Sequence, residues 1–259
     1  MRPVAPRRAA LLRALAVAAV ALAPLPAQAA GPCAPVAEAD PVGTTACPGV
    51  RPGARLQSGD EVCSFGFLFA GSDRRRYVAT AGHCAFDPDP ATTPGRTQVW
   101  RTAGPVARDG AGKQVGRFVY ATMAGEFKDF ALIRLDPGVA SSPQMCHFGG
   151  PTSLTTEVHN RDVLVHHYGQ GTGLDYVPAR TGDAFFGLYK PDYVYFYGAA
   201  SEGDSGSPVI DADGAAVGLV TDLTTPFTGN VGVNRLAAHV AAAARSLRIR
   251  LTLLTAPAL

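Results

Sequence analysis

Three short segments contain the residue types from which a serine nucleophile can be built. Residues 203–208 read Gly-Asp-Ser-Gly-Ser-Pro, residues 80–84 read Thr-Ala-Gly-His-Cys, and residues 129–135 read Asp-Phe-Ala-Leu-Ile-Arg-Leu. A serine hydroxyl becomes a useful nucleophile when a base removes its proton. Imidazole is the usual base near neutral pH, and a partly buried carboxylate fixes its tautomer. We therefore predict a catalytic triad of three residues: His83, Asp129 and Ser205.

Each segment also has an ordinary structural interpretation. Gly-Asp-Ser-Gly can be a tight turn, an isolated histidine is more often a surface or core residue, and an aspartate commonly begins a strand. The chain order His, Asp, Ser favours catalysis of one kind, because α/β-hydrolases and subtilisin-like enzymes use other orders. The glycines also allow two N–H groups to converge on a developing oxyanion. We assign this oxyanion hole to Gly203 and Ser205.

The segments that must position these residues have the pattern of β-strands. Glycine (29 residues) and proline (21 residues) are frequent, and short apolar or alternating runs recur between turn residues. These runs predict strands at 63–69, 76–80, 97–100, 115–120, 130–135, 163–165, 193–197, 207–210 and 216–220. Residues 211–214 predict a hairpin turn. The Ala-rich run 236–247 predicts a C-terminal helix, and the chain is expected to be all-β apart from it.

The first 29 residues have the order of a secretory signal peptide. Arginines precede an apolar run at 14–25, and Ala27-Gln28-Ala29 follows it. We therefore expect a secreted protein, extracellular or periplasmic, with twin-arginine export as an alternative raised by Arg7 and Arg8. The mature formal charge is about −2, since the 23 basic residues lose four arginines with the signal and the 21 acidic residues lose none. This balance favours neither nucleic acid nor a membrane as partner.

Together the three segments resemble the signature blocks of the trypsin/chymotrypsin family. Cys63-Ser-Phe-Gly-Phe is similar to the small bacterial members, such as the streptogrisins. The resemblance covers about residues 59–238 and implies two antiparallel six-stranded barrels, with the site in the cleft between them. The first barrel would supply His83 and Asp129, and the second Ser205.

The resemblance implies a domain organisation and an activity. We expect a signal peptide at 1–29, a Pro/Ala/Gly-rich segment at 30–58, a first barrel at 59–140, a linker at 141–156, and a second barrel with the C-terminal helix at 157–259. The activity would be endopeptidase hydrolysis through an acyl-enzyme, by a monomer acting on proteins or peptides without metal or cofactor. Alternatives are a protease-fold binding protein without productive substrate access, and an esterase with the same triad.

The substrate pocket departs from the pattern of the family. The resemblance places Ala199 at the base of the primary pocket, where trypsin-like members hold an aspartate, so the sequence does not predict cleavage after Lys or Arg. The strand that would align the substrate has Asp222 and Leu223 where the family has an aromatic residue or glycine and then a glycine. The predicted pocket contains five residues: Ala199, Glu202, Thr221, Asp222 and Leu223.

Five cysteines follow the signal, and an exported chain is expected to form disulfides. An odd number leaves at least one thiol free or bonded to another chain. The resemblance implies a disulfide between Cys63 and Cys84. It also places Cys146 where chymotrypsin tethers its N-terminal segment, so we predict that Cys146 pairs with Cys47 or, less favoured, Cys33. A local disulfide between Cys33 and Cys47 is the alternative.

The resemblance also bears on activation. Trypsin-like zymogens are cut to free an ammonium that pairs with the aspartate before the nucleophile, here Asp204. The sequence lacks Arg-Ile-Val-Gly-Gly, and Arg55-Leu56 is its nearest substitute, so we expect no such cleavage. We predict instead that His167, helped by Tyr168, hydrogen-bonds Asp204, the alternative being that another donor serves this carboxylate.

Overall fold

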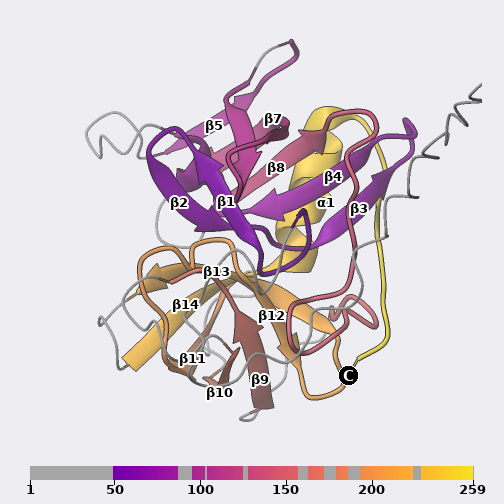
Figure 1. Cartoon of the computed structure of the whole chain (residues 1–259). Coiled ribbons are helices and arrows are strands. Elements are labelled where there is room, and N and C mark those ends of the chain that lie inside the picture. The colour runs from indigo at the N-terminus through magenta and orange to yellow at the C-terminus, as the bar shows by residue number, and fades with distance from the viewer. Residues whose placement is uncertain are drawn as a thin grey trace, which may run out of the picture.

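The computed structural model describes residues 49–86, 95–102, 104–124, 128–156, 163–171, 179–185, 193–223 and 229–258. The predicted signal peptide and most of the segment at 30–58 lie outside these residues. Two β-sheets lie one above the other, and one α-helix packs against the upper sheet (Figure 1). No helix in these ranges is long and apolar enough to cross a membrane.

The first sheet corresponds to the predicted first barrel, but it contains nine strands where six were expected. In chain order they are β1 (Arg55–Ser58), β2 (Glu61–Ser64), β3 (Leu68–Gly71), β4 (Arg76–Thr80), β5 (Arg96–Val99), β6 (Val106–Asp109), β7 (Gln114–Met123), β8 (Asp129–Leu135) and β15 (Leu251–Leu253). Their order in the sheet is β15-β3-β4-β8-β7-β6-β1-β2, and β5 also pairs with β7. Strand β1 begins four residues before the expected boundary at residue 59 and is part of this sheet.

Strand β8 is central to this sheet, between β4 and β7. Every residue of β8 except Arg134 is buried. A strand covered on both faces needs the continuous apolar run that begins after Asp129. Asp129 is consequently held at the first position of a rigid strand.

The predicted strand at 63–69 is divided into β2 and β3. The chain between them changes its hydrogen-bond partner, because Phe65 N–H bonds to Ala54 O whereas Gly66 N–H bonds to Ala79 O. A Cβ at Gly66 would lie 2.5 Å from a methyl of Leu219 and 3.0 Å from the carbonyl of Gly206. Only glycine fits where this segment packs against the second barrel.

The second sheet is a closed barrel of six strands, in the order β10-β11-β14-β13-β12-β9. In chain order they are β9 (Val163–Tyr168), β10 (Ala179–Phe185), β11 (Tyr193–Gly198), β12 (Pro208–Asp211), β13 (Ala216–Leu223) and β14 (Gly229–Arg235). Its core is rich in valine from alternate strand positions. The predicted hairpin turn at 211–214 is confirmed, since β12 pairs with β13 across it.

Helix α1 (Leu236–Leu247) has the predicted bounds. Its buried residues follow the helical period: Leu236, His239, Val240 and Ala243. The ring of His239 stacks on Phe130, at a centroid distance of 5.8 Å. The all-β, double-barrel fold with a C-terminal helix is therefore as expected, and α1 packs beside the residue that follows Asp129.

Candidate active site

His83 and Asp129 meet because their strands are neighbours. His83 begins the short 3-10 helix η1 (His83–Ala85), which follows β4, and Asp129 begins β8, which pairs with β4 in antiparallel register. Nδ1 of His83 lies 2.6 Å from Oδ2 of Asp129, and the His83 N–H donates to Oδ1 at 2.8 Å. The carboxylate thus holds both the ring and the backbone of the histidine.

Gly82 permits this approach. A Cβ at this position would lie 2.1 Å from the carbonyl oxygen of Thr122 and 2.8 Å from Oδ1 of Asp129. Backbone atoms at such a distance cannot move aside without shifting the strand. The glycine of Thr-Ala-Gly-His-Cys is therefore required for contact between η1 and β8.

The pKa of His83 lies above its ordinary value of 6.5. Burial lowers this pKa, but the charge of Asp129 and its hydrogen bond to the ring together raise it by more. Glu61 and Asp222 add smaller contributions in the same direction. A carboxylate that stabilises the imidazolium is the electrostatic arrangement that a general base requires.

Ser205 lies on the loop between β11 and β12, and its residue is partly exposed. Gly203 and Gly206 on either side have φ angles of 99° and 84°, which favour glycine. A Cβ at Gly206 would lie 2.1 Å from Oγ1 of Thr80. Thr80 ends β4 just before His83, so the loop packs against the strand that leads to the histidine.

A hydrogen bond between the hydroxyl of Ser205 and the ring of His83 is not among the contacts of the described residues. Nucleophile and base are often farther apart without a substrate than in the reacting complex. The two residues come from different barrels, and the serine loop is fixed to the first barrel by a hydrogen bond from Ser64 N–H to Ser205 O at 2.8 Å.

The backbone donors of the serine loop fall into two groups. The N–H of Asp204 bonds to Ser201 O, and the N–H of Gly206 bonds to Val220 O. Across the described ranges, the N–H groups of Gly203 and Ser205 donate to no protein acceptor. These are the two N–H groups that the sequence assigned to an oxyanion hole.

Asp204 is fully buried, and two backbone N–H groups are described as donors to its carboxylate. Its Oδ1 accepts the N–H of Gly171 at 2.8 Å, and its Oδ2 accepts the N–H of Ser201 at 2.9 Å. Nε2 of His167 lies 2.8 Å from the carbonyl oxygen of Ala199 instead. The predicted bond from His167 to Asp204 is not among the described contacts.

The register of β9 determines where His167 lies, and its bond to Asp204 stays a prediction. His167 pairs with Val209 of β12, and its ring packs on Phe196 inside the second barrel. The chain reaches the carboxylate a few residues later, where a Cβ at Gly169 or Gly171 would lie within 2.5 Å of an oxygen of Asp204. The absence of a side chain at these two glycines lets the backbone approach the carboxylate closely.

The predicted pocket residues lie in two places: Ala199 and Glu202 follow β11, and the other three end β13. Ala199 is half-buried, Glu202 is exposed, Thr221 is buried and Asp222 is half-buried. The side chain of Leu223 lies outside the described part of the chain. A bulge between Val220 and Asp222 interrupts the pairing of β13 with β14. Because residue 199 is alanine, it contributes no carboxylate to the predicted pocket.

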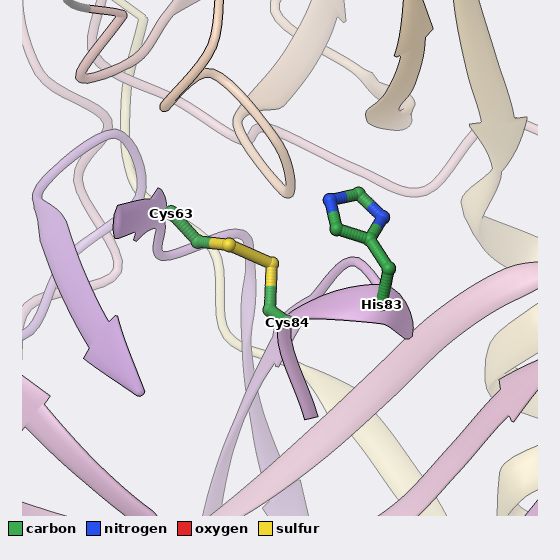
Figure 2. Close-up of side chains that lie close together, drawn as sticks. All are labelled: Cys63, His83 and Cys84. Carbon is green, nitrogen blue, oxygen red and sulfur yellow. A yellow bond between two sulfur atoms is a disulfide. The ribbon is translucent and has the colours of Figure 1, made fainter. Parts of the chain in front are cut away.

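The sulfur atoms near His83 form a disulfide. Cys63 of β2 is bonded to Cys84 of η1, beside the imidazole (Figure 2). Cys63, His83 and Cys84 lie close enough to suggest a metal site, but disulfide sulfurs lack the thiolate that binds a metal. Cys146 is also disulfide-bonded, and its proposed partners Cys33 and Cys47 lie outside the described residues.

Two residues that hold the site were not identified from the sequence. Asn234 of β14 donates through Nδ2 to the carbonyl of Asp129. Ser64 donates through Oγ to the carbonyl of Gly203 at 2.9 Å. The Cys-Ser-Phe-Gly-Phe segment contains Ser64, but its partner is 139 residues away, so only the fold reveals the contact.

Residues 63–219 match the family of trypsin-like peptidase domains. Among solved structures, a glutamic-acid-specific serine protease described as using a histidine triad in substrate binding is 16% identical over 78% of this chain and 100% of that chain, with a TM-score of 0.54. Thermobifida fusca protease A is 16% identical over 79% and 99%, with a TM-score of 0.54. Cellulomonas bogoriensis chymotrypsin is 19% identical over 79% and 99%, with a TM-score of 0.52.

A search of curated protein sequences found no match. The similar structures show the shared fold, and the family match covers more than half of the chain. The chain therefore belongs to the trypsin-like peptidases, a family of serine endopeptidases.

Proposed function

We propose that this chain is a secreted serine endopeptidase that hydrolyses peptide bonds through an acyl-enzyme. Ser205 attacks the scissile carbonyl while His83 takes its proton and later donates it to the leaving amine. Asp129 orients the imidazole and stabilises its charged form. The N–H groups of Gly203 and Ser205 bind the oxyanion of the tetrahedral intermediate.

The contact between His83 and Asp129 is the observation that carries this proposal. The 2.6 Å distance from Nδ1 to the carboxylate leaves Nε2 as the ring nitrogen for the nucleophile. The serine loop reaches the same region, because it is bonded to Ser64 and packs against Thr80. Secretion is supported by the N-terminal sequence pattern and by the disulfide between Cys63 and Cys84, since disulfides persist outside the cytosol.

We do not expect the primary pocket to select substrates with Lys or Arg before the cleaved bond. Ala199, at the base of this pocket, has a methyl side chain and so carries no charge that could pair with a basic substrate residue. Asp222 on the substrate-aligning strand is half-buried and contributes to the potential at His83. A substrate strand would pair with the end of β13 from Thr221 to Leu223, which extends beyond Leu219, where the pairing with β12 ends.

The test is cleavage of a mixed peptide library by the purified mature protein, with mass-spectrometric identification of the new termini. We expect internal cleavages whose primary residue is neither Lys nor Arg. Ser205→Ala and His83→Ala should each lower the rate by about 10⁴ or more. Ester hydrolysis without any amide hydrolysis would support the esterase alternative, and equal cleavage by wild type and Ser205→Ala would exclude the proposed triad.

A further inference from the structure

Ser64 connects the first barrel to the serine loop through both its backbone and its side chain. The residue is fully buried at the end of β2, next to Cys63. Its N–H donates to Ser205 O at 2.8 Å, and its Oγ donates to Gly203 O at 2.9 Å. The two carbonyls that Ser64 binds belong to the same two residues whose N–H groups form the proposed oxyanion hole.

We propose that the hydroxyl of Ser64 is a positioning group that holds the oxyanion loop in its active conformation. This inference rests on the proposed function. Gly203 has a φ of 99° and no Cβ, so its own backbone has little to restrict rotation. The hydrogen bond from the Ser64 hydroxyl to Gly203 O fixes the peptide plane between Gly203 and Asp204. The bond from Ser64 N–H to Ser205 O fixes the peptide plane between Ser205 and Gly206. A loop held at both carbonyls keeps its N–H groups preorganised toward the oxyanion.

The direction of the Ser64 hydroxyl is itself fixed. Oγ accepts the N–H of Gln170 at 2.9 Å, which directs the hydroxyl hydrogen toward Gly203. The Gln170 side chain in turn donates to Gly53 O at 2.8 Å. The carbonyl of Ser64 accepts the hydroxyl of Thr80, which ends β4 before the catalytic histidine. One buried serine therefore joins the N-terminal segment, both barrels and the oxyanion loop.

Removing this hydroxyl leaves two buried groups without a partner, the N–H of Gln170 and the carbonyl of Gly203. The structure offers a matched control in Ser207, which is also fully buried and lies two residues after Ser205. The hydroxyl of Ser207 has no hydrogen-bond partner among the described residues. Ser207→Ala thus removes a buried hydroxyl beside the nucleophile without removing a hydrogen bond.

The experiment compares Ser64→Ala with Ser207→Ala in kcat, KM and affinity for a peptidyl boronic acid, whose tetrahedral adduct places an oxygen in the oxyanion hole. We expect Ser64→Ala to lower kcat and boronate affinity by about 10- to 100-fold, with KM and the affinity for the product peptide nearly unchanged. Ser207→Ala should stay within about twofold of wild type.

Several outcomes would overturn the role of Ser64. They are an unchanged kcat in Ser64→Ala, an equal loss in Ser207→Ala, or a loss confined to KM. If Ser64→Ala does not fold, Ser64→Cys keeps the volume with a weaker donor and should give a smaller loss of kcat in the same direction. Failure of wild type to react with the boronic acid at Ser205 would instead count against the proposed function.

A second, independent feature is a basic face on the first barrel. Six arginines line two adjoining hollows of about 600 and 250 Å³, which share Asp73: Arg74, Arg75, Arg76, Arg101, Arg134 and Arg248. Among the contacts described for these residues, none of the six arginines forms an ion pair. Asp73 and Asp136 are the acidic residues that line these hollows. The face therefore carries a net positive charge that its own residues do not neutralise.

The smaller hollow combines charge with apolar surface. Val99, Trp100, Leu247 and Ile249 line it beside Arg101 and Arg248. We infer that this face binds an acidic peptide segment with an apolar side chain, of the kind that a protein substrate or inhibitor would present. Carboxylates would pair with the arginines, and the apolar side chain would pack beside Trp100. A polyanion without apolar groups would leave that part of the hollow unused.

The basic face is separated from the proposed catalytic residues. Arg76 begins β4 and Thr80 ends it, so the turn between β3 and β4 lies at the opposite end of the strand from His83. This turn and the C-terminal end of α1 both lie at the top of the upper sheet in Figure 1. A segment bound there would leave the nucleophile accessible.

Trp100 is the one tryptophan in the chain, so its fluorescence reports on this hollow directly. The probe is a peptide of alternating Glu and Asp around one Leu, titrated into Ser205→Ala protein at two salt concentrations. We expect a saturable change in Trp100 emission that weakens with salt, and at least a tenfold loss of affinity in Arg101→Ala/Arg248→Ala. Arg108→Ala, which removes an exposed arginine of β6, should bind like Ser205→Ala alone. Absence of binding, or equal affinity for polyphosphate and for the peptide without its Leu, would overturn the inference.

Discussion

The side-chain amide of Asn234 donates a hydrogen bond to the main-chain carbonyl of Asp129. Asn234 is fully buried in β14 of the second barrel, whereas Asp129 begins β8 of the first. The main chain of the residue whose carboxylate orients His83 is therefore fixed by a side chain from the other barrel. Helix α1, which follows β14 directly, adds the stacking of His239 on Phe130 at the next position.

Asn234→Ala should lower both stability and activity. It leaves the buried carbonyl of Asp129 without this donor, which costs about 1–3 kcal/mol of unfolding free energy. It also frees the start of β8, so we expect kcat/KM to fall by roughly tenfold. Urea denaturation and steady-state kinetics measure the two effects.

Gln114→Ala is the matched control for this variant. It removes another amide donor, from Gln114 Nε2 to Asp136 at the far side of the first barrel. We expect a smaller loss of stability and an unchanged kcat/KM. Equal kinetic effects of the two variants would show that Asn234 acts through overall stability alone.

The pH dependence of activity should reflect the raised pKa of His83. The neutral ring is the base, so activity rises with pH through the pKa of His83, which lies above 6.5. The protonated ring contributes stability that is fully present below 6.5 and lost as pH rises through the folded-state pKa. An acidic limb of kcat/KM centred below pH 6.5 would contradict this assignment, as would an unchanged limb in Asp129→Asn.

The disulfide between Cys63 and Cys84 should stabilise the first barrel. It closes a loop with a sequence separation of 21 residues, worth roughly 3 kcal/mol in the chain-entropy account. Cys63→Ala/Cys84→Ala should therefore lose about that much unfolding free energy. Peptide mapping without reduction serves as the control, and it should join Cys146 to the peptide of Cys47 or Cys33. A Cys33–Cys47 peptide would be inconsistent with the bonded state of Cys146.

Activity should not require cleavage at Arg55. Arg55 and Leu56 lie within β1, where they pair with Ser64 and Cys63 of β2, and Leu56 is fully buried. A cut there would break the strand that pairs with β2, whose Ser64 contacts the serine loop. Protein beginning at Ala30 with Arg55→Gln should retain full activity in a peptide assay. If it becomes active only after proteolysis, the expectation is wrong.

The fold could be predicted from the sequence where strands are rich in branched and aromatic residues. Strands β4 and β8 and helix α1 were visible as apolar or periodic runs. Strands β10 and β14 were not, because Gly, Asn and Asp interrupt their pattern and disfavour strands in isolation. In β14 the pairing with two neighbours overrides this preference, and Gly232 is required where a Cβ would lie 1.7 Å from Tyr193 Oη.

The candidate site was predictable where its residues lie in short segments of the sequence. The proposed nucleophile, base and carboxylate each lie in a short segment with recognisable chemistry. The donors to Asp204 were not predictable, because backbone N–H groups approach it at Gly171 and Ser201 and no side-chain pattern marks them. The basic face was hidden for a related reason: Arg101, Arg134 and Arg248 are far in sequence from the run of three arginines at 74–76, and only the fold brings them together.

The most direct test of the account is the reaction of the mature protein with a fluorophosphonate, followed by mapping of the modified residue. In this account His83 removes the proton of Ser205, and the N–H groups of Gly203 and Ser205 bind the adduct. The fluorophosphonate should therefore label the protein rapidly and at one position. We predict a single adduct on Ser205, absent in Ser205→Ala and strongly slowed in His83→Ala. Labelling at another residue, or none in a correctly folded protein, would contradict the account.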